Sequence, residues 1–422
     1  PSAAQPGHYN CPIVASYPEV LQANIEALQQ DTITFYHAFL PLDDPKRLAT
    51  RLKAVLAPEN LTDDELKDAL AAACREQQAY RQDVLAYGKQ ALAAIADGNL
   101  TGIVLAGRPY HLDPAVNHGL PALLAGFDVA VLSEDCLPKA AAAPALTVVN
   151  QWTYHSRLYN AAQFVTEQPG LELVQLTSFG CGLDAVTADE VAAILRGGNK
   201  LFTLLKLDDI NNLGAARIRI RSLLAARRRT RQQPPTAAAH ARPVFTKTMR
   251  RTHTILAPQL APIHFELLEP AFAGAGYQLE ILSETTPETV ETGLRYLNHD
   301  TCYPAIIAIG QLVQALQSGR YDLSKTAVMM SQTGGCCRAT NYLPLLRKAL
   351  TQAGLGHIPA ISFSAGIEAS PGFTWSYGLL DRCLKALVYG DLLQQLLLRT
   401  RPYEKSPGAA EALFQTSLAR CK

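Results

Sequence analysis

Cysteines flanked by glycines are the residues of this chain that best suit metal binding or nucleophilic attack. Segment 180–182 reads Gly-Cys-Gly after an apolar run, and Gly-Gly-Cys-Cys at 334–337 follows a second apolar run. A cysteine between a strand and a helix N-terminus lies near the positive end of the helix dipole. That position favours the thiolate, the form that ligates metals or attacks electrophiles. Flanking glycines let the backbone approach a bulky ligand closely, so both loops predict a thiol-based site.

Two further cysteines lie in sequence contexts that suit a metal ligand. Cys302 precedes an apolar helical stretch, and Cys11 is followed by Pro12, which fixes a turn. Because adjacent residues seldom both reach one iron atom, only one of Cys336 and Cys337 is expected to be a ligand. A lone cysteine is more often a small buried hydrophobic residue. That interpretation is favoured for Cys74, Cys383 and Cys421, and both interpretations stay open for Cys136.

A polar loop offers a second kind of chemistry. Segment 107–119 follows the apolar run 102–106 and contains Arg108, His111 and His118. These side chains could bind a phosphate or an acyl group, or transfer protons. The alternative is an ordinary hydrogen-bonded loop. Segment 151–157, Gln-Trp-Thr-Tyr-His-Ser-Arg, indicates a helix surface that packs on a neighbouring element.

The elements that must position these residues recur in a parallel α/β pattern. Thr187-x-x-Glu190 predicts a helix that begins at Thr187, after the Cys181 loop. Ligands of open parallel sheets bind at the carboxyl ends of strands, where the two cysteine loops are expected to lie. The predicted strands are 102–106, 128–132, 171–176, 201–207, 253–257, 277–282, 326–330 and 358–363.

The predicted fold class is α/β, with two tandem Rossmann-like parallel-sheet units and a helical N-terminal segment. Residues 1–98 are expected to be mostly helical and to continue an upstream domain. Within them, Thr62-x-x-Glu65 is a capping box that predicts a helix start, and Gly98 is a plausible stop. Residues 99–231 and 251–422 are predicted to form the first and second α/β domains, the second with C-terminal helices. A linker of Pro/Ala-rich composition is predicted at 232–250.

Composition narrows the function classes. The 422 residues carry 38 Lys+Arg and 37 Asp+Glu, and this balance argues against a general nucleic-acid binder. No apolar run of membrane-spanning length occurs. Nine cysteines, an odd number, without a signal peptide indicate a reducing compartment, so the cytoplasm is predicted. Since the sequence begins Pro-Ser-Ala-Ala-Gln without an initiator Met, we expect it to be a piece of a longer protein.

Several motifs together resemble a known family. They are Gly-Arg-Pro-Tyr-His-Leu-Asp at 107–113, Ser-Phe-Gly-Cys-Gly-Leu-Asp at 178–184, Gly-Ala-Ala-Arg-Ile-Arg-Ile-Arg at 214–221, His-Asp-Thr-Cys-Tyr-Pro at 299–304 and Ser-Gln-Thr-Gly-Gly-Cys-Cys-Arg at 331–338. They resemble the C-terminal region of the large 2-hydroxyacyl-CoA dehydratase activase-related proteins. Relatives of that family include the double-cubane iron–sulfur cluster proteins.

The resemblance implies an electron-accepting module. ATP-hydrolysing activase domains, ahead of this region or on a partner protein, would transfer one low-potential electron to a cysteine-bound cluster. ATP is expected to bind only to those activase domains. The cluster would be 4Fe-4S or double-cubane, and the substrate an acyl-CoA or a small molecule. The resemblance also allows a homodimer. It implies Cys11, Cys181, Cys302 and Cys337 as metal ligands. The residue patterns described above predict Gly180, Gly182, Gly334 and Gly335 as cofactor-binding residues and Arg108, His111 and His118 as catalytic groups.

Two features depart from the family pattern. An upstream Cys-Tyr/Phe-Pro segment, expected to mirror the one at 302–304, does not occur in this sequence, and Cys336 stands where a third glycine is expected. Two other hypotheses therefore remain. One is a metal-free binding or scaffolding module. The other is a thiol enzyme with Cys181 or Cys302 as nucleophile and His111 or His118 as base.

Overall fold

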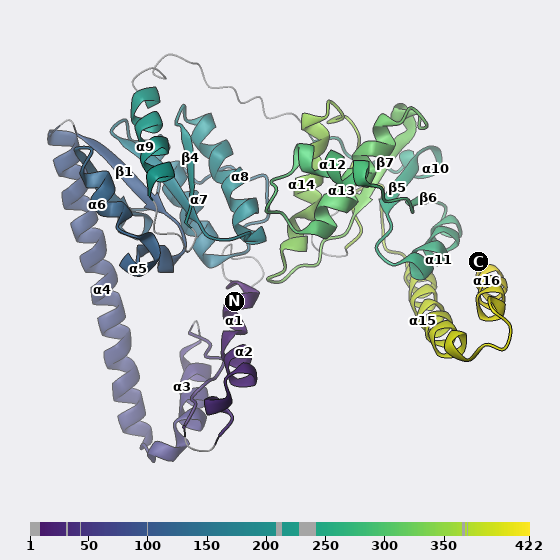
Figure 1. The fold of residues 1–422 in the computed structure, drawn as a ribbon, viewed down its shortest axis with the longest axis horizontal. Coiled ribbons are helices and arrows are strands. Elements are labelled where there is room, and N and C mark those ends of the chain that lie inside the picture. The colour runs from purple at the N-terminus through teal and green to yellow at the C-terminus, as the bar shows by residue number, and fades with distance from the viewer. Residues whose placement is uncertain are drawn as a thin grey trace. The chain divides into compact units, whose positions relative to one another are not determined.

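The computed structural model describes residues 9–30, 33–42, 44–98, 100–207, 213–227, 242–364, 368 and 370–422. The chain divides into two compact units, Pro1–Ala237 (unit 1) and Ala238–Lys422 (unit 2) (Figure 1). Positions 232–241 of the predicted linker lie outside the described residues.

Unit 1 begins with a helical segment, as the sequence predicts. Its longest helix, α4, has the predicted capping box between Thr62 and Glu65 and ends at Gly98. One end of α4 packs beside the sheet, and the rest extends beyond it (Figure 1). The helices of this segment are α1 (Pro12–Ala15), α2 (Tyr17–Asn24), η1 (Glu26–Leu28), α3 (Pro45–Val55), η2 (Ala57–Glu59) and α4 (Asp63–Asp97).

The described strands of unit 1 form a parallel sheet in the order β2-β1-β3-β4. Strand β3 is buried along its whole length and β1 nearly so, which explains the apolar run of β1. Strand β3 also buries the polar side chains of Glu172 and Gln175. The strands are β1 (Thr101–Ala106), β2 (Val129–Ser133), β3 (Leu171–Thr177) and β4 (Phe202–Lys206). The helices are η3 (Pro109–Leu112), α5 (Pro114–Asn117), α6 (Leu120–Ala125), η4 (Glu134–Cys136), α7 (Thr153–Thr166), α8 (Gly182–Gly197) and α9 (Gly214–Arg227).

Unit 2 repeats this topology. Its described strands form a parallel sheet in the order β6-β5-β7-β8, with the apolar core around Phe272 between the sheet and α11 and α15. The strands are β5 (Thr254–Pro258), β6 (Gln278–Leu282), β7 (Thr326–Met330) and β8 (Ala360–Ser362). The helices are α10 (Met249–Thr252), α11 (Pro262–Ala273), α12 (Pro287–Tyr296), α13 (Tyr303–Gln317), η5 (Leu323–Lys325), η6 (Arg338–Asn341), α14 (Tyr342–Gln352), α15 (Tyr377–Thr400), η7 (Arg401–Tyr403) and α16 (Ala409–Cys421).

The α/β fold class with two tandem parallel sheets is therefore confirmed, but one local prediction was wrong. The helix after the Cys181 loop begins at Gly182, not at Thr187, whose hydroxyl donates to the carbonyl of Leu183 inside the helix. Segment 151–157 packs on a neighbouring element as predicted, because α7 contacts α8 and both Trp152 and His155 are buried. Within the described part of the chain, no helix combines the length and apolar character that a bilayer crossing requires.

Candidate functional site

The polar loop and the first cysteine loop of unit 1 meet because of the sheet topology. Strands β1 and β3 are parallel neighbours, so the loops that follow them leave the same edge of the sheet. The chain passes from β1 to β2 on one side, and β3 lies on the other side of β1. Such a reversal opens a crevice at the carboxyl ends of the strands. Arg108 and Cys181 lie on these two loops.

Arg108 connects an acid and a thiol. Its Nε lies 3.0 Å from Oδ1 of Asp184, and both side chains are almost fully buried. Its Nη2 lies 3.8 Å from Sγ of Cys181. Burial alone would lower the pKa of Arg108, but the charge of Asp184 and the thiol of Cys181 keep that pKa raised. A permanent positive charge is thus held next to the Cys181 sulfur.

The thiol of Cys181 is not a preformed thiolate. Burial raises its pKa, and the charge of Asp184 raises it further. The backbone N–H groups of Asp184 and Leu183, together with Arg108, act in the opposite direction and do not outweigh burial. The helix N-terminus favours the thiolate as expected, but burial and the charge of Asp184 favour the protonated thiol more strongly. A bound cation would favour deprotonation of this thiol.

His111 is fixed in one neutral form. The backbone N–H of Arg108 donates to its Nδ1 at 2.9 Å, so its other nitrogen, Nε2, carries the proton and donates to Ser178 Oγ at 2.9 Å. Burial lowers the pKa of His111 to about 4. With both nitrogens engaged, His111 orients the two loops toward each other. His118, by contrast, adopts the left-handed conformation after α5.

Sequence reasoning missed the acid and the second histidine of this cluster. Burial would raise the pKa of Asp184, but bonds from His155 and Arg108 lower it below its usual value. His155 Nε2 lies 3.2 Å from Asp184 Oδ1. An acid three residues after the N-cap Cys181 is the signal that could have marked Asp184.

Strand β3 buries a polar side chain without a hydrogen-bond partner, opposite Ala106 at the end of β1. Gln175 is fully buried, and neither of its amide atoms has a hydrogen-bond partner among the described residues. Such a group calls for a bound water or ligand atom, because an unpaired buried amide is costly.

Cys11 is held against the start of α7 in unit 1. Tyr9 pairs in parallel with Trp152: the N–H of Tyr9 donates to the carbonyl of Gln151, and the N–H of Thr153 donates to the carbonyl of Tyr9, both at 2.9 Å. Cys11 is buried and is the N-cap residue of α1. Its side chain makes no capping bond, so the thiol does not serve this helix.

In unit 2, Tyr342 brings two cysteines together. Sγ of Cys302, the N-cap of α13, lies 2.8 Å from the hydroxyl of Tyr342, the first residue of α14. Burial raises the pKa of Tyr342, the thiol of Cys302 raises it further, and Cys337 adds to the effect. Cys337 is therefore close enough to act on the same phenol. We call Cys302, Cys337 and Tyr342 the Cys302 site.

The loop before Cys337 needs its glycines. Gly334 and Gly335 have φ angles of 72° and 63°, in the left-handed region that disfavours other residues. A Cβ built on Gly335 would meet nothing within 4 Å, so the constraint is conformational and the space beside this residue is open. Cys337 is the N-cap of η6 and accepts a bond from the N–H of Ala339. In unit 1, Gly182 begins α8, and Gly180 is exposed in the turn before it.

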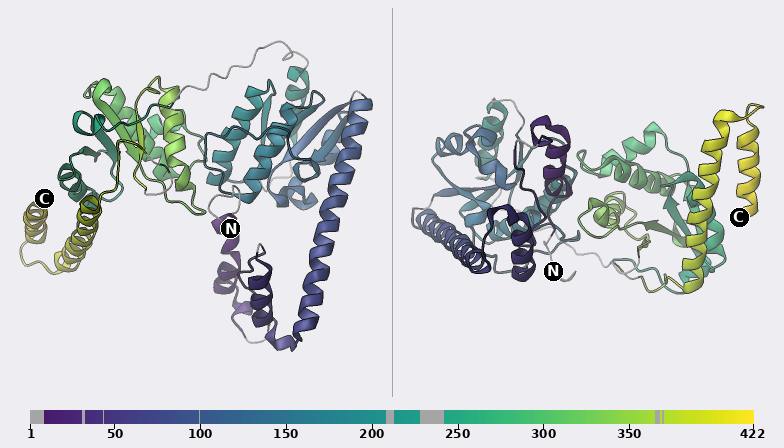
Figure 2. Two further views of the ribbon diagram at one scale, coloured as in Figure 1. Left: turned by 180° about the vertical axis from the view of Figure 1, so that it is seen from behind. Right: turned by 90° about the horizontal axis from the view of Figure 1, so that it is seen from below.

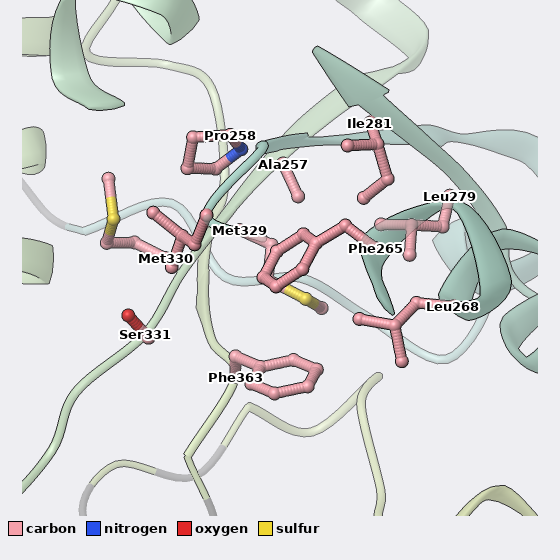
Figure 3. Close-up of a pocket in the computed structure, with 11 residues that line it drawn as sticks. Ala257, Pro258, Phe265, Leu268, Leu279, Ile281, Met329, Met330, Ser331 and Phe363 are labelled. Atoms are coloured by element: carbon pink, nitrogen blue, oxygen red, sulfur yellow. The ribbon is translucent and has the colours of Figure 1, made fainter. Parts of the chain in front are cut away.

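A narrow apolar pocket lies at the carboxyl ends of the unit 2 strands. Met330 and Phe363 line it beside Phe265 of α11 (Figure 3). Ser331 is the one hydroxyl among its lining residues. The pocket thus offers apolar packing next to the strand that leads into the Gly334 loop.

The four predicted ligands share one local position. Cys11, Cys181, Cys302 and Cys337 are the N-cap residues of α1, α8, α13 and η6. Cys11 and Cys181 belong to unit 1, and Cys302 and Cys337 belong to unit 2. Within the described residues, no group of three or more His, Cys, Asp or Glu side chains is arranged to hold a metal ion. The ligand assignments thus stay predictions.

Comparison with known proteins bears on the N-terminal third of the chain. Residues 1–137 match the family described as the CoA enzyme activase uncharacterised domain. Residues 1–137 thus carry an activase-related domain. This confirms the activase-related resemblance predicted from the motifs. The activase-related domain contains the helical segment, Cys11, β1, β2, Arg108 and His111, while Cys181 lies beyond it.

The other comparisons add no functional argument. No curated protein matches the chain. A solved structure of the E. coli RcsC C-terminus, containing a linker region and a phosphoreceiver domain, is 11% identical with a TM-score of 0.15. That likeness covers 72% of this chain and 96% of the other. At such a low TM-score it carries no conclusion about the fold or activity of the chain with the activase-related domain.

Proposed function

We propose that this chain is the iron–sulfur, electron-accepting module of an ATP-driven low-potential reductase or 2-hydroxyacyl-CoA dehydratase-type system. The observation that carries the proposal is the shared N-cap position of Cys11, Cys181, Cys302 and Cys337. Cys74, Cys136, Cys336, Cys383 and Cys421 are not helix N-caps. A helix N-terminus presents unpaired N–H groups and a positive dipole end, which suit a thiolate-ligated, anionic cofactor.

The donor chemistry of the Cys302 site fits such a group. The thiols of Cys302 and Cys337 both act on the phenol of Tyr342, and the space beside Gly335, two residues before Cys337, is open. The thiols of Cys11 and Cys302 do not cap their helices, which leaves them available as ligands. A 4Fe-4S or double-cubane cluster, when bound, would supply one-electron transfer at low potential.

The residues around the thiols have roles of their own. Arg108 holds a positive charge beside Cys181 and would offset the negative charge of a thiolate there. Asp184 fixes Arg108, and His111 fixes the loop that carries it. Tyr342 keeps its proton, because burial and Cys302 raise its pKa, and its hydroxyl can donate to sulfur. His118 remains a candidate for proton transfer.

The source of the electron and the compartment belong to the same proposal. An ATP-hydrolysing activase, as upstream domains or as a separate protein, would donate the electron, in line with the activase-related domain at 1–137. An acyl-CoA or a small molecule would receive it. Such thiols require a reducing compartment, so we place the protein in the cytoplasm.

A thiol enzyme is less well supported by the geometry. At Cys181 the contacting group is Arg108, and the lone pair of His111 is occupied by a backbone N–H. Burial also raises the pKa of the Cys181 thiol. At Cys302 the contacting group is a tyrosine hydroxyl.

Serine substitutions test the proposal cleanly, because serine is itself a preferred N-cap residue and should preserve the helices. After anaerobic reconstitution, the wild type should show the visible absorption of an iron–sulfur cluster. Cys181→Ser, Cys302→Ser or Cys337→Ser should each lower it strongly. The exposed Cys74 and Cys421 give matched controls, since Cys74→Ser and Cys421→Ser should retain the absorption.

Cys336→Ser should also retain the cluster absorption. Because Cys337→Ser should lose it, the pair of variants shows which of the two adjacent cysteines is the ligand. Equal absorption in all variants would refute the ligand set. A wild type that remains colourless would favour a metal-free scaffolding module.

A further inference from the structure

A polar pocket of about 280 Å³ lies beside β6, at the edge of the described sheet of unit 2. Its walls come from the end of β6, the loop that follows, and the helices α12 and α13. These two helices pack against each other on the side of unit 2 away from α15 and α16, which are yellow in Figure 2. At roughly 30 Å³ per water molecule, the pocket has room for a ligand of about nine non-hydrogen atoms. We call it the Gln311 pocket, after a residue of α13 that lines it.

Close helix packing and hydrogen bonds hold the walls of the Gln311 pocket. A Cβ built on Gly310 would lie 2.1 Å from the carbonyl oxygen of Thr289, so a glycine is needed for α13 to approach α12 this closely. The hydroxyl of Thr289 donates to Oε1 of Gln314 at 2.7 Å. Nε2 of Gln311 donates to the carbonyl of Glu284 at 2.9 Å, which ties the loop after β6 to α13. These contacts fix the shape of the pocket.

Two glutamines on one face of α13 have amide atoms without a hydrogen-bond partner. Gln311 is only 4% exposed, yet its Oε1 accepts no hydrogen bond from the described residues. Such a buried acceptor calls for a bound water or ligand atom. Gln314 uses its Oε1 for Thr289, and its Nε2 has no partner within the described part of the chain. Because the two glutamines are three residues apart on a helix, they offer an acceptor and a donor side by side.

Two charged side chains of opposite sign line the same pocket. Glu284 lies on the loop after β6, and Arg320 lies just beyond the C-terminal end of α13. Among the residues that the structure describes, neither side chain has an ion-pair partner. Glu280, the third charged residue of the lining, differs because its carboxylate accepts a hydrogen bond from the hydroxyl of Tyr321. One carboxylate and one guanidinium are thus left to pair with the charges of a ligand.

We propose that the Gln311 pocket binds a free amino acid. The ammonium group of the ligand would donate to Oε1 of Gln311 and to the carboxylate of Glu284. The carboxylate of the ligand would accept from Nε2 of Gln314 and from the guanidinium of Arg320. An ammonium group has only donors and an ionised carboxylate only acceptors, so each end of an amino acid matches one set of these protein atoms. This inference does not rest on the proposed function.

Thermal shift assays of the whole chain with each of the standard amino acids, followed by isothermal titration calorimetry, test the site. At least one amino acid should raise the melting temperature and bind at one site per chain. Glu284→Gln and Arg320→Gln should each weaken its binding about tenfold or more, because each removes a charge-assisted hydrogen bond. Glu291→Gln and Arg295→Gln are the matched controls, since both residues are exposed on α12 outside the pocket lining, and these variants should bind like the wild type.

Probes that carry one kind of charge test the ligand class. A diamine places a positive charge against Arg320, and a dicarboxylate places a negative charge against Glu284. Putrescine and succinate should therefore each bind about tenfold or more weakly than the amino acid, and equal or tighter binding of either probe would overturn the assignment. Circular dichroism melting checks that every variant folds. A wild type that binds none of the amino acids, or unchanged binding in Glu284→Gln and Arg320→Gln, would overturn the proposal as well.

Discussion

Arg108 and Asp184 form an almost fully buried ion pair, with 3.0 Å between Nε and Oδ1, that joins the loop after β1 to the first turn of α8. This pair holds the Arg108 guanidinium next to Cys181. Removing one member of a buried ion pair leaves the other charge buried without a partner. This lowers the free energy of unfolding more than replacing both members with apolar residues does.

Asp184→Ala should therefore lower the free energy of unfolding by about 3–5 kcal/mol. The double substitution Arg108→Met with Asp184→Leu should recover much of that loss, because no unpaired charge remains. Urea unfolding of the two variants and the wild type measures both effects. A loss below about 1 kcal/mol in Asp184→Ala would show that the pair is solvated in solution.

His111 should make the fold sensitive to acid. Its folded pKa of about 4 lies below the unfolded value of 6.5, so its stabilisation is fully present above pH 6.5. As the pH falls from 6.5 through 4, the unfolded chain binds a proton that the folded chain does not, and about 3 kcal/mol is lost. In His111→Gln that part of the pH dependence should disappear from urea unfolding curves. An unchanged slope would mean that His111 titrates normally.

Glu134 should act in the opposite direction. Burial raises its folded pKa from 4.5 to about 7, against the opposing charge of Arg157 at 2.9 Å. Its contribution is present below pH 4.5 and is lost as the pH rises through 7, by about 3 kcal/mol. Glu134→Gln should remove this loss and be relatively more stable at pH 8 than at pH 5. A wild type and variant with parallel pH profiles would contradict the prediction.

Gly390 should be required where α15 crosses α11. Gly390→Ala places a Cβ 2.4 Å from Cδ2 of His264, so the imidazole ring must shift or the helices must separate, at a cost of about 1–3 kcal/mol. Gly378→Ala is the matched control on the same helix, because a Cβ there meets nothing within 4 Å. It should leave stability unchanged or raise it by up to about 1 kcal/mol. Thermal unfolding distinguishes the two, and equal melting temperatures would contradict the close packing.

Periodicity and capping signals predicted the elements well, but not the contacts between them. The strand predicted at 326–330 is β7, and the Thr62 capping box begins α4, because both depend on neighbouring residues alone. The pairing of Trp152 with Tyr9 could not be predicted, because the two residues lie far apart in the sequence. Helix α8 begins earlier than Thr187 because a tertiary contact, Arg108 to Asp184, stabilises its first turn.

The candidate site shows the same limit. The loops of Arg108 and Cys181 were identified from local sequence, and their proximity follows from the parallel pairing of β1 and β3. The roles of Asp184 and Tyr342 emerge only when side chains from separate elements meet.

Iron and acid-labile sulfide per chain, measured after anaerobic purification, decide whether this chain binds an iron–sulfur cluster. We expect stoichiometric iron and sulfide in the wild type and their loss when Cys181→Ser and Cys302→Ser are combined. Protein that contains neither, even after reconstitution with iron and sulfide, would contradict the iron–sulfur function.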